Sequence, residues 1–196
     1  SAEAMASQGV RAASLDEVFR YDGTEWSRQT GISFSRPGHP FAMHGTGPGD
    51  VHVVGPCGVV ARFDGSAWQN VKTPVPVSLY DVWARTPTEA YAAGREEKVT
   101  ADNGIESGPG VLLRYDGQAW TQVAGPTAEP MYHVAACDDG TLVVATLAAV
   151  YTSGPGGSWS EPLPRAERSV GAVRCDGQSI MVVTRENGRT RFWAWR

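Results

Sequence analysis

The 196-residue chain lacks several features that would assign it to a specialised class of protein. No stretch approaches the 18 or more apolar residues of a membrane-spanning helix, so we expect no membrane span. Lysine is nearly absent, with two copies against fifteen arginines. The arginines occur singly, so no basic stripe indicates a nucleic-acid partner. Residues 1–14 lack the basic and then apolar build of a signal peptide, and we treat them as an N-terminal extension before one domain, residues 15–196.

Cysteine is also scarce. Cys57, Cys137 and Cys175 are too few for a disulfide framework, and we expect them to be buried thiols. No Cys-x-x-Cys pair or cysteine/histidine cluster occurs, so the sequence predicts no metal site. A Gly-x-Ser-x-Gly elbow, a His-Glu-x-x-His helix and a phosphate-binding glycine loop before a helix are all missing. We therefore expect no cofactor and assign no catalytic residue.

What the chain does have is an internal repeat. A segment of the form Arg-aromatic-Asp-Gly-x-x-Trp ends at Trp26, Trp68 and Trp120, and a decayed copy ends at Trp159. The tryptophans are 42, 52 and 39 residues apart, and an insertion over residues 96–110 accounts for the longest interval. The period is thus close to 40 residues. The repeat residues assigned a structural role are Asp22, Gly23, Trp26, Asp64, Gly65, Trp68, Asp116, Gly117, Trp120 and Trp159.

Each Asp-Gly pair stands between two runs of alternating apolar residues, which predicts a tight hairpin of type I′. A second pair of strands precedes each hairpin, so the unit has four strands, A to D. Four-stranded units without any helix-period segment predict an all-β fold, a β-propeller of four-stranded antiparallel blades. Counting strands predicts five blades, with strand A missing from the first and strand D from the last. Four blades with a composite closing sheet from both termini is the alternative, and a fragment that completes its ring by self-association is a third.

The Arg-[Tyr/Phe]-Asp-Gly-x-x-Trp segments follow a strand that begins with an acid and ends with glycine. They resemble repeats of large secreted or surface bacterial proteins, often from myxobacteria, that form propellers. They are also distantly similar to the Asp-box of BNR propellers, although here Asp and Gly are adjacent and Arg replaces the Ser of that motif. The resemblance covers residues 15–196 and implies a secreted, periplasmic or cell-surface protein. It implies no catalytic residues, because the Asp-box is itself a folding element.

In a propeller the B–C and D–A loops emerge on the same face. The 96–110 insertion and the 29–40 connection would share that face, and long loops in a compact domain are commonly functional. Strand A lies nearest the axis, where His44 and Trp83 occupy equivalent positions. The predicted binding-face residues are therefore Arg36, His39, His44, Trp83, Arg95, Glu96, Glu97, Asp102 and Asn103.

These features favour a non-catalytic binding or scaffold module that recognises protein or glycan. Beyond the repeat tryptophans no exposed aromatic residue is expected to recur in register, which disfavours a lectin with repeated pockets. One alternative is a subunit of a larger assembly completed by strand pairing, including self-association through the terminal strands. The other is a glycan-active enzyme, which would need two facing carboxylates in the loop-rich mouth.

Overall fold

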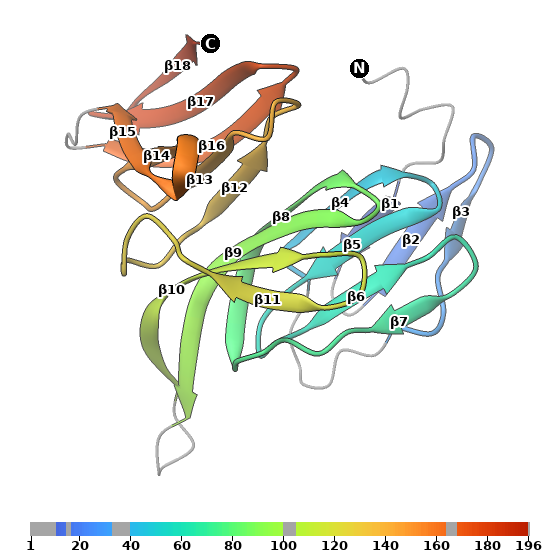
Figure 1. Cartoon of the computed structure of the whole chain (residues 1–196). Coiled ribbons are helices and arrows are strands. Elements are labelled where there is room, and N and C mark those ends of the chain that lie inside the picture. The colour runs from blue at the N-terminus through green and yellow to red at the C-terminus, as the bar shows by residue number, and fades with distance from the viewer. Residues whose placement is uncertain (1–10, 15–16, 33–39, 100–104, 164–167, 196) are drawn as a thin grey trace.

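The computed structural model describes residues 11–14, 17–32, 40–99, 105–163 and 168–195. These residues form antiparallel strands and a single 3-10 turn, η1 (Pro155–Gly157). The strands belong to five sheets (Figure 1). In the described ranges no helix is long and apolar enough to cross a membrane.

Each sheet is made of strands that follow one another in the chain. The first sheet contains β1 (Arg11–Ser14), β2 (Glu17–Tyr21) and β3 (Trp26–Arg28). The second contains β4 (Ala42–Gly47), β5 (Asp50–Val54), β6 (Val60–Phe63) and β7 (Trp68–Asn70). The third contains β8 (Val77–Thr86), β9 (Glu89–Val99), β10 (Ile105–Tyr115) and β11 (Trp120–Val123). The fourth contains β12 (His133–Ala136), β13 (Leu142–Ala145), β14 (Val150–Ser153) and β15 (Trp159–Leu163). The fifth contains β16 (Arg168–Asp176), β17 (Ser179–Glu186) and β18 (Arg189–Trp195).

The sheets pack face to face in chain order around an axis. The first strands of successive sheets, β4, β8, β12 and β16, contact one another in that order. Four separate hydrophobic cores lie between the sheets, one for each neighbouring pair. The predicted all-β propeller is confirmed. Each of the three inner blades buries both faces against its neighbours, because a single four-stranded sheet has no interior of its own.

The first and last sheets have three strands each and lie at opposite ends of the array (Figure 1). In the described residues no sheet combines strands from both ends of the chain. Strand β1 pairs with β2 from Arg11↔Arg20 to Ser14↔Glu17. The first sheet therefore begins inside the segment that we treat as an extension, residues 1–14.

The repeat hairpins close through the aspartate side chain. In the second blade Oδ1 of Asp64 accepts hydrogen bonds from the backbone N–H groups of Ser66 and Ala67, both at 2.9 Å. These bonds, that of Ala67 foremost, lower the pKa of Asp64 to about 2. Gly65 has a φ of 98°, whereas Asp64 is not among the described residues with positive φ. The type I′ prediction is therefore wrong: the loop has four residues, and an aspartate that holds two amides replaces the second left-handed position.

The expectation of buried thiols is also wrong. Cys137, which follows β12, and Cys175 in β16 form a disulfide between the A strands of the fourth and fifth blades. Cys57 is exposed on the β5–β6 turn and takes no part in a disulfide.

Candidate binding site

The insertion between the second and third tryptophans extends two strands rather than forming a long loop. Strand β9 runs to Val99 and β10 starts at Ile105, and these two residues pair across the ribbon. The register shifts once, between Ser107 and Gly110. The predicted loop over 96–110 is thus mostly paired backbone, because a ladder satisfies the peptide groups that a long loop would leave to water. The resulting ribbon projects beyond the rest of its sheet (Figure 1).

The predicted binding-face residues divide into two groups. Arg36, His39, Asp102 and Asn103 lie outside the described residues. The remaining five lie on three strands: His44 on β4, Trp83 on β8, and Arg95, Glu96 and Glu97 on β9.

The β9 residues cover the beginning of β8. The guanidinium of Arg95 lies 5.8 Å from the centre of the Tyr80 ring, and its Nη1 donates to the Ser107 hydroxyl at 3.1 Å. Glu97 accepts a hydrogen bond from the Ser78 hydroxyl. Side chains alternate along a strand, so Glu96 projects to the other side of the ribbon. The extended ribbon therefore places one arginine and one carboxylate beside Tyr80.

Tyr80 is the middle ring of an aromatic row that crosses three blades. Its ring stacks on Phe41 with centroids 5.6 Å apart and on Tyr132 with centroids 4.8 Å apart. The interplanar angles are 22° and 21°. Phe41 is 41 % exposed, and the two tyrosines are half-buried. The row lies where strand A begins in each blade, at the end of the axis that the β9–β10 ribbon flanks.

An aromatic residue recurs in register at this end of strand A, although of the three rings only Phe41 is exposed. Phe41, Tyr80 and Tyr132 each stand three residues before the strand-A position of His44, Trp83 and Ala135. The signal was thus present in the aligned repeats. It is weak in the sequence because only the packing of the A strands around the axis brings residues some 40 or 50 positions apart into one row.

A second stacked pair lies further along the same strands. The rings of His44 and Trp83 are 4.1 Å apart at an interplanar angle of 21°. The backbone N–H of Ala84 donates to Nδ1 of His44 at 3.0 Å, which requires that nitrogen to be unprotonated. Burial lowers the pKa of His44 to about 4, and the positive charge of Arg174 adds to this effect. His44 is therefore neutral at physiological pH and acts as a packing and acceptor group.

Asp81 forms the polar centre between the third, fourth and fifth blades. Its carboxylate is 3.8 Å from Nδ1 of His133 and 3.7 Å from Nη1 of Arg174. It also accepts hydrogen bonds from the backbone N–H groups of Val82 at 3.0 Å and Val134 at 3.2 Å. Arg174 lies in addition 5.7 Å from the Trp83 ring. Asp81 thus joins three blades below the aromatic row.

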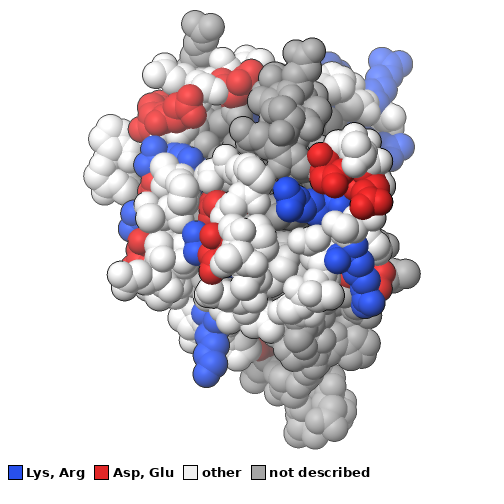
Figure 2. Space-filling view, turned by 90° about the vertical axis from the view of Figure 1, so that its right-hand side faces the viewer, with Lys and Arg blue, Asp and Glu red and all other residues white. Residues whose placement is uncertain are grey.

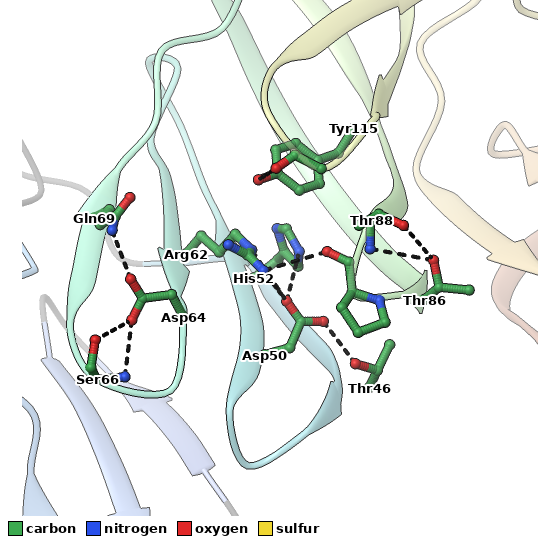
Figure 3. A network of polar contacts seen from close by, with 12 residues as sticks. Thr46, Asp50, His52, Arg62, Asp64, Ser66, Gln69, Thr86, Thr88 and Tyr115 are labelled. Carbon is green, nitrogen blue, oxygen red and sulfur yellow. Dashed lines mark hydrogen bonds and ion pairs between the residues drawn. The ribbon is translucent and has the colours of Figure 1, made fainter.

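A second polar network surrounds Arg62, the repeat arginine of the second blade (Figure 3). Nη2 of Arg62 donates to Asp50 at 2.9 Å and to the carbonyl of Pro87 in the next blade at 3.4 Å. Thr46 donates to the second carboxylate oxygen of Asp50 at 2.8 Å. The Arg62 guanidinium also lies 5.5 Å from the Tyr115 ring of the next blade. These contacts tie the second blade to the third, so this network is structural.

The face drawn in Figure 2 is mostly uncharged, with basic and acidic groups interspersed over it. Neither sign forms a stripe on this face. Long-range steering needs an extended field of one sign, and the described residues on this face do not present one.

No protein-family model and no curated protein matches the sequence. Solved structures of β-propeller proteins do match its fold. One is YCF48 bound to D1 peptide, with a TM-score of 0.63 at 12 % identity over 94 % of this chain and 61 % of that one. A second is the extracellular domain of the putative one-component system BT4673 from B. thetaiotaomicron, with a TM-score of 0.63 at 14 % identity over 93 % and 26 %. A third is a catalytically inactive virginiamycin B lyase from Staphylococcus aureus with quinupristin, with a TM-score of 0.60 at 12 % identity over 91 % and 63 %.

Identities this low show a shared fold and nothing finer. The chain spans about three fifths of the YCF48 and lyase chains and about a quarter of the BT4673 domain. The neighbours include binding or scaffold domains and enzymes, so the fold is compatible with both.

Proposed function

We propose that this chain is a non-catalytic binding module that recognises protein, through an extended peptide segment, at the mouth of the propeller axis. The observation behind the proposal is the row Phe41–Tyr80–Tyr132, flanked by Arg95. Rings of this kind supply much contact area at little cost in side-chain entropy, and aromatic and arginine side chains are enriched among the residues that dominate binding energy.

The stacking of the row favours a peptide over a glycan. A sugar binds an aromatic residue by lying on an open ring face. Here one face of Tyr80 is covered by Tyr132, and Phe41 and Arg95 also contact that ring. The row therefore offers ring edges and a guanidinium beside its covered middle ring. Such a surface suits apolar side chains together with a carboxylate or backbone carbonyl. The neighbour whose structure contains a bound peptide is consistent with this choice.

The alternative of a glycan-active enzyme finds less support at the same mouth. A glycosidase needs two carboxyl groups that face each other across the substrate. In the described part of the mouth, Glu97 accepts a hydrogen bond from Ser78, and Asp81 lies deeper with two backbone amides as donors. Both carboxylates therefore have partners within the fold.

A location outside the cell, in the periplasm or at the cell surface, fits the Cys137–Cys175 disulfide. Such bonds form and persist mainly in oxidising compartments. The resemblance to secreted bacterial repeat proteins and the extracellular-domain neighbour support the same proposal.

A peptide-display library and a glycan array, both screened with the intact chain, test this function. We expect peptides and not glycans to be retained. Tyr80→Ala and Arg95→Ala should each weaken binding of a selected peptide at least about tenfold, as expected for central interface residues. Tyr80→Phe keeps the stack and should preserve most of the affinity. Arg189→Ala removes an exposed arginine from the start of β18 and should leave the affinity unchanged.

The proposal fails if the selected peptides bind Tyr80→Ala and Arg95→Ala as tightly as the unaltered chain. It also fails if only glycans are retained, in which case the glycan-binding alternative takes its place. Circular dichroism of each variant, compared with the unaltered chain, separates loss of the site from loss of the fold.

A further inference from the structure

In the second and third blades the tryptophan of the repeat hairpin packs against the preceding blade. Trp120 lies edge-on to His52 of the second blade, with ring centroids 5.6 Å apart, and is 3 % exposed. Trp68 packs in one core with Val18 of the first blade and is 8 % exposed. Each indole is backed by the aromatic residue before the turn, at 5.4 Å for Trp120 and 5.3 Å for Trp68. This aromatic pair is therefore the part of the repeat that joins one blade to the blade before it.

The first blade contains the same pair without a cover. The ring centroids of Tyr21 and Trp26 are 5.3 Å apart, as in the two buried pairs. Trp26 is nevertheless 53 % exposed. Because the local geometry is unchanged, the difference in exposure arises from the blade that would lie against this face.

The last blade exposes the complementary surface. Aligned on strand B, Met181 stands where His52 stands in the second blade, at the position that receives a tryptophan from the next blade. Met181 is 43 % exposed. Phe192 on β18 pairs with Val183 on β17, so it shares the face of Met181, and it is 80 % exposed. Three of the five exposed large hydrophobic side chains in the described residues thus lie on the two terminal faces, namely Trp26, Met181 and Phe192.

We propose that these two faces bind each other between two copies of this chain, end to end. The face of β1–β3 with Tyr21 and Trp26 would pack on the partner's face of β16–β18 with Met181 and Phe192, as one blade packs on the next. The two faces lie at opposite ends of one molecule (Figure 1), so a second copy supplies the contact that a single chain leaves open. The flexible thioether of methionine packs well against an aromatic ring. The contact is made by sheet faces, in contrast to the strand pairing that the sequence analysis left open as an alternative, and it is independent of the proposed peptide site.

An interface between two different faces has a distinctive signature. Every molecule keeps one open face of each kind, so association continues beyond the dimer unless a ring closes. Removing either face should block self-association. A chain that has lost only its first-blade face should nevertheless pair with a chain that has lost only its last-blade face.

Sedimentation velocity of the intact chain across a wide concentration range tests this. We expect concentration-dependent dimers and larger species for the unaltered chain. Trp26→Ser and Phe192→Ser should each weaken self-association at least about tenfold. An equimolar mixture of these two variants should form a dimer and nothing larger, because each contributes its intact face. Leu147→Ser removes an exposed leucine outside both faces and should leave association unchanged.

A chain that is monomeric at every concentration would overturn the proposal. So would loss of association in Trp26→Ser with none in Phe192→Ser, which would indicate two identical faces in contact. Failure of the mixed variants to pair, although each remains folded by circular dichroism, would also contradict it.

Discussion

Reduction of the disulfide between Cys137 and Cys175 should weaken the fifth blade selectively. The two cysteines are 38 residues apart, and the loop that they close contains β13, β14 and β15. In the chain-entropy account, a cross-link over a loop of this length stabilises the folded state by about 4 kcal/mol. The apolar core between the fourth and fifth blades includes both cysteines, but most of its members are other apolar side chains. We therefore expect the reduced chain to fold, but with lower stability at its C-terminal end.

Urea unfolding with and without reductant measures the loss, and hydrogen exchange locates it. Blades are stabilised mainly by their neighbours, so the effect should decay along the array. Amide protection in β16, β17 and β18 should fall on reduction, whereas protection in β5 and β6 should change little. A Cys137→Ala/Cys175→Ala double variant should match the reduced chain and show no further response to reductant. Cys57→Ser serves as the control and should behave like the unaltered chain.

Two results would refute this reasoning. One is an identical urea midpoint in the presence and absence of reductant. The other is a thiol titration of the native, oxidised chain that detects all three cysteines instead of the Cys57 thiol alone.

Three further predictions concern packing, two of them between blades and one within a blade. Trp120→Ala should lower the free energy of unfolding by about 3–5 kcal/mol, because the indole of Trp120 is buried. Trp26→Ala should lower it by much less, because Trp26 is exposed; this comparison is made at a concentration where the chain is monomeric. Burial lowers the pKa of His52 from 6.5 to about 4, so the stability that this residue contributes is complete above pH 6.5 and is lost as the pH falls through 4. His52→Tyr copies the residue at the equivalent position in the third blade. The urea midpoint of this variant should change less with pH across that range than the midpoint of the unaltered chain. Gly94→Ala would place a Cβ against the backbone carbonyl oxygen of Ser78 on β8. This variant should lower the free energy of unfolding in urea by about 1–3 kcal/mol.

The fold could be predicted because the repeat encodes it locally. Each Asp-Gly hairpin is specified by residues within one turn, and recurrence at one period implies stacked units. The turn type could not be read in the same way. Oδ1 of Asp22 accepts from the amides of Thr24 and Glu25 at 2.8 and 3.0 Å, and this side-chain capping replaces the backbone geometry that the dipeptide alone suggests.

The candidate site was only partly predictable, because it depends on contacts between blades. The sequence placed Arg95 and Glu97 at the mouth, on the assumption of a long loop there. Whether a polar insertion forms a loop or a ribbon depends on backbone pairing that its composition does not specify. The partner of Arg95, Tyr80, lies on the neighbouring strand β8, so this contact depends on the register of the extended β8–β9 pair.

The pairing of cysteines was missed for a similar reason. Cys137 and Cys175 occupy equivalent places in neighbouring units, and equivalent positions on adjacent A strands lie close together near the axis of a propeller. Their Cα atoms are 5.1 Å apart. Equal position in consecutive repeats was therefore a signal for a bond between blades, although an odd number of cysteines argued against it.

Residues of the hairpin motif that recur from blade to blade make different contacts from the strand-A residues that differ between blades. The recurrent ones contact the turn or a neighbouring strand or blade: the aspartate accepts from turn amides, Arg62 reaches the next blade, and Trp68 and Trp120 pack on the preceding one. At the axis, by contrast, the strand-A position is His44 in one blade, Trp83 in the next and Ala135 in the third. Binding sites repeated around a ring need equal residues at equal positions. The axis of this propeller is asymmetric, so a ligand at its mouth should bind with one copy per chain, and isothermal titration that found several equivalent sites would contradict the assignment of the site to the mouth.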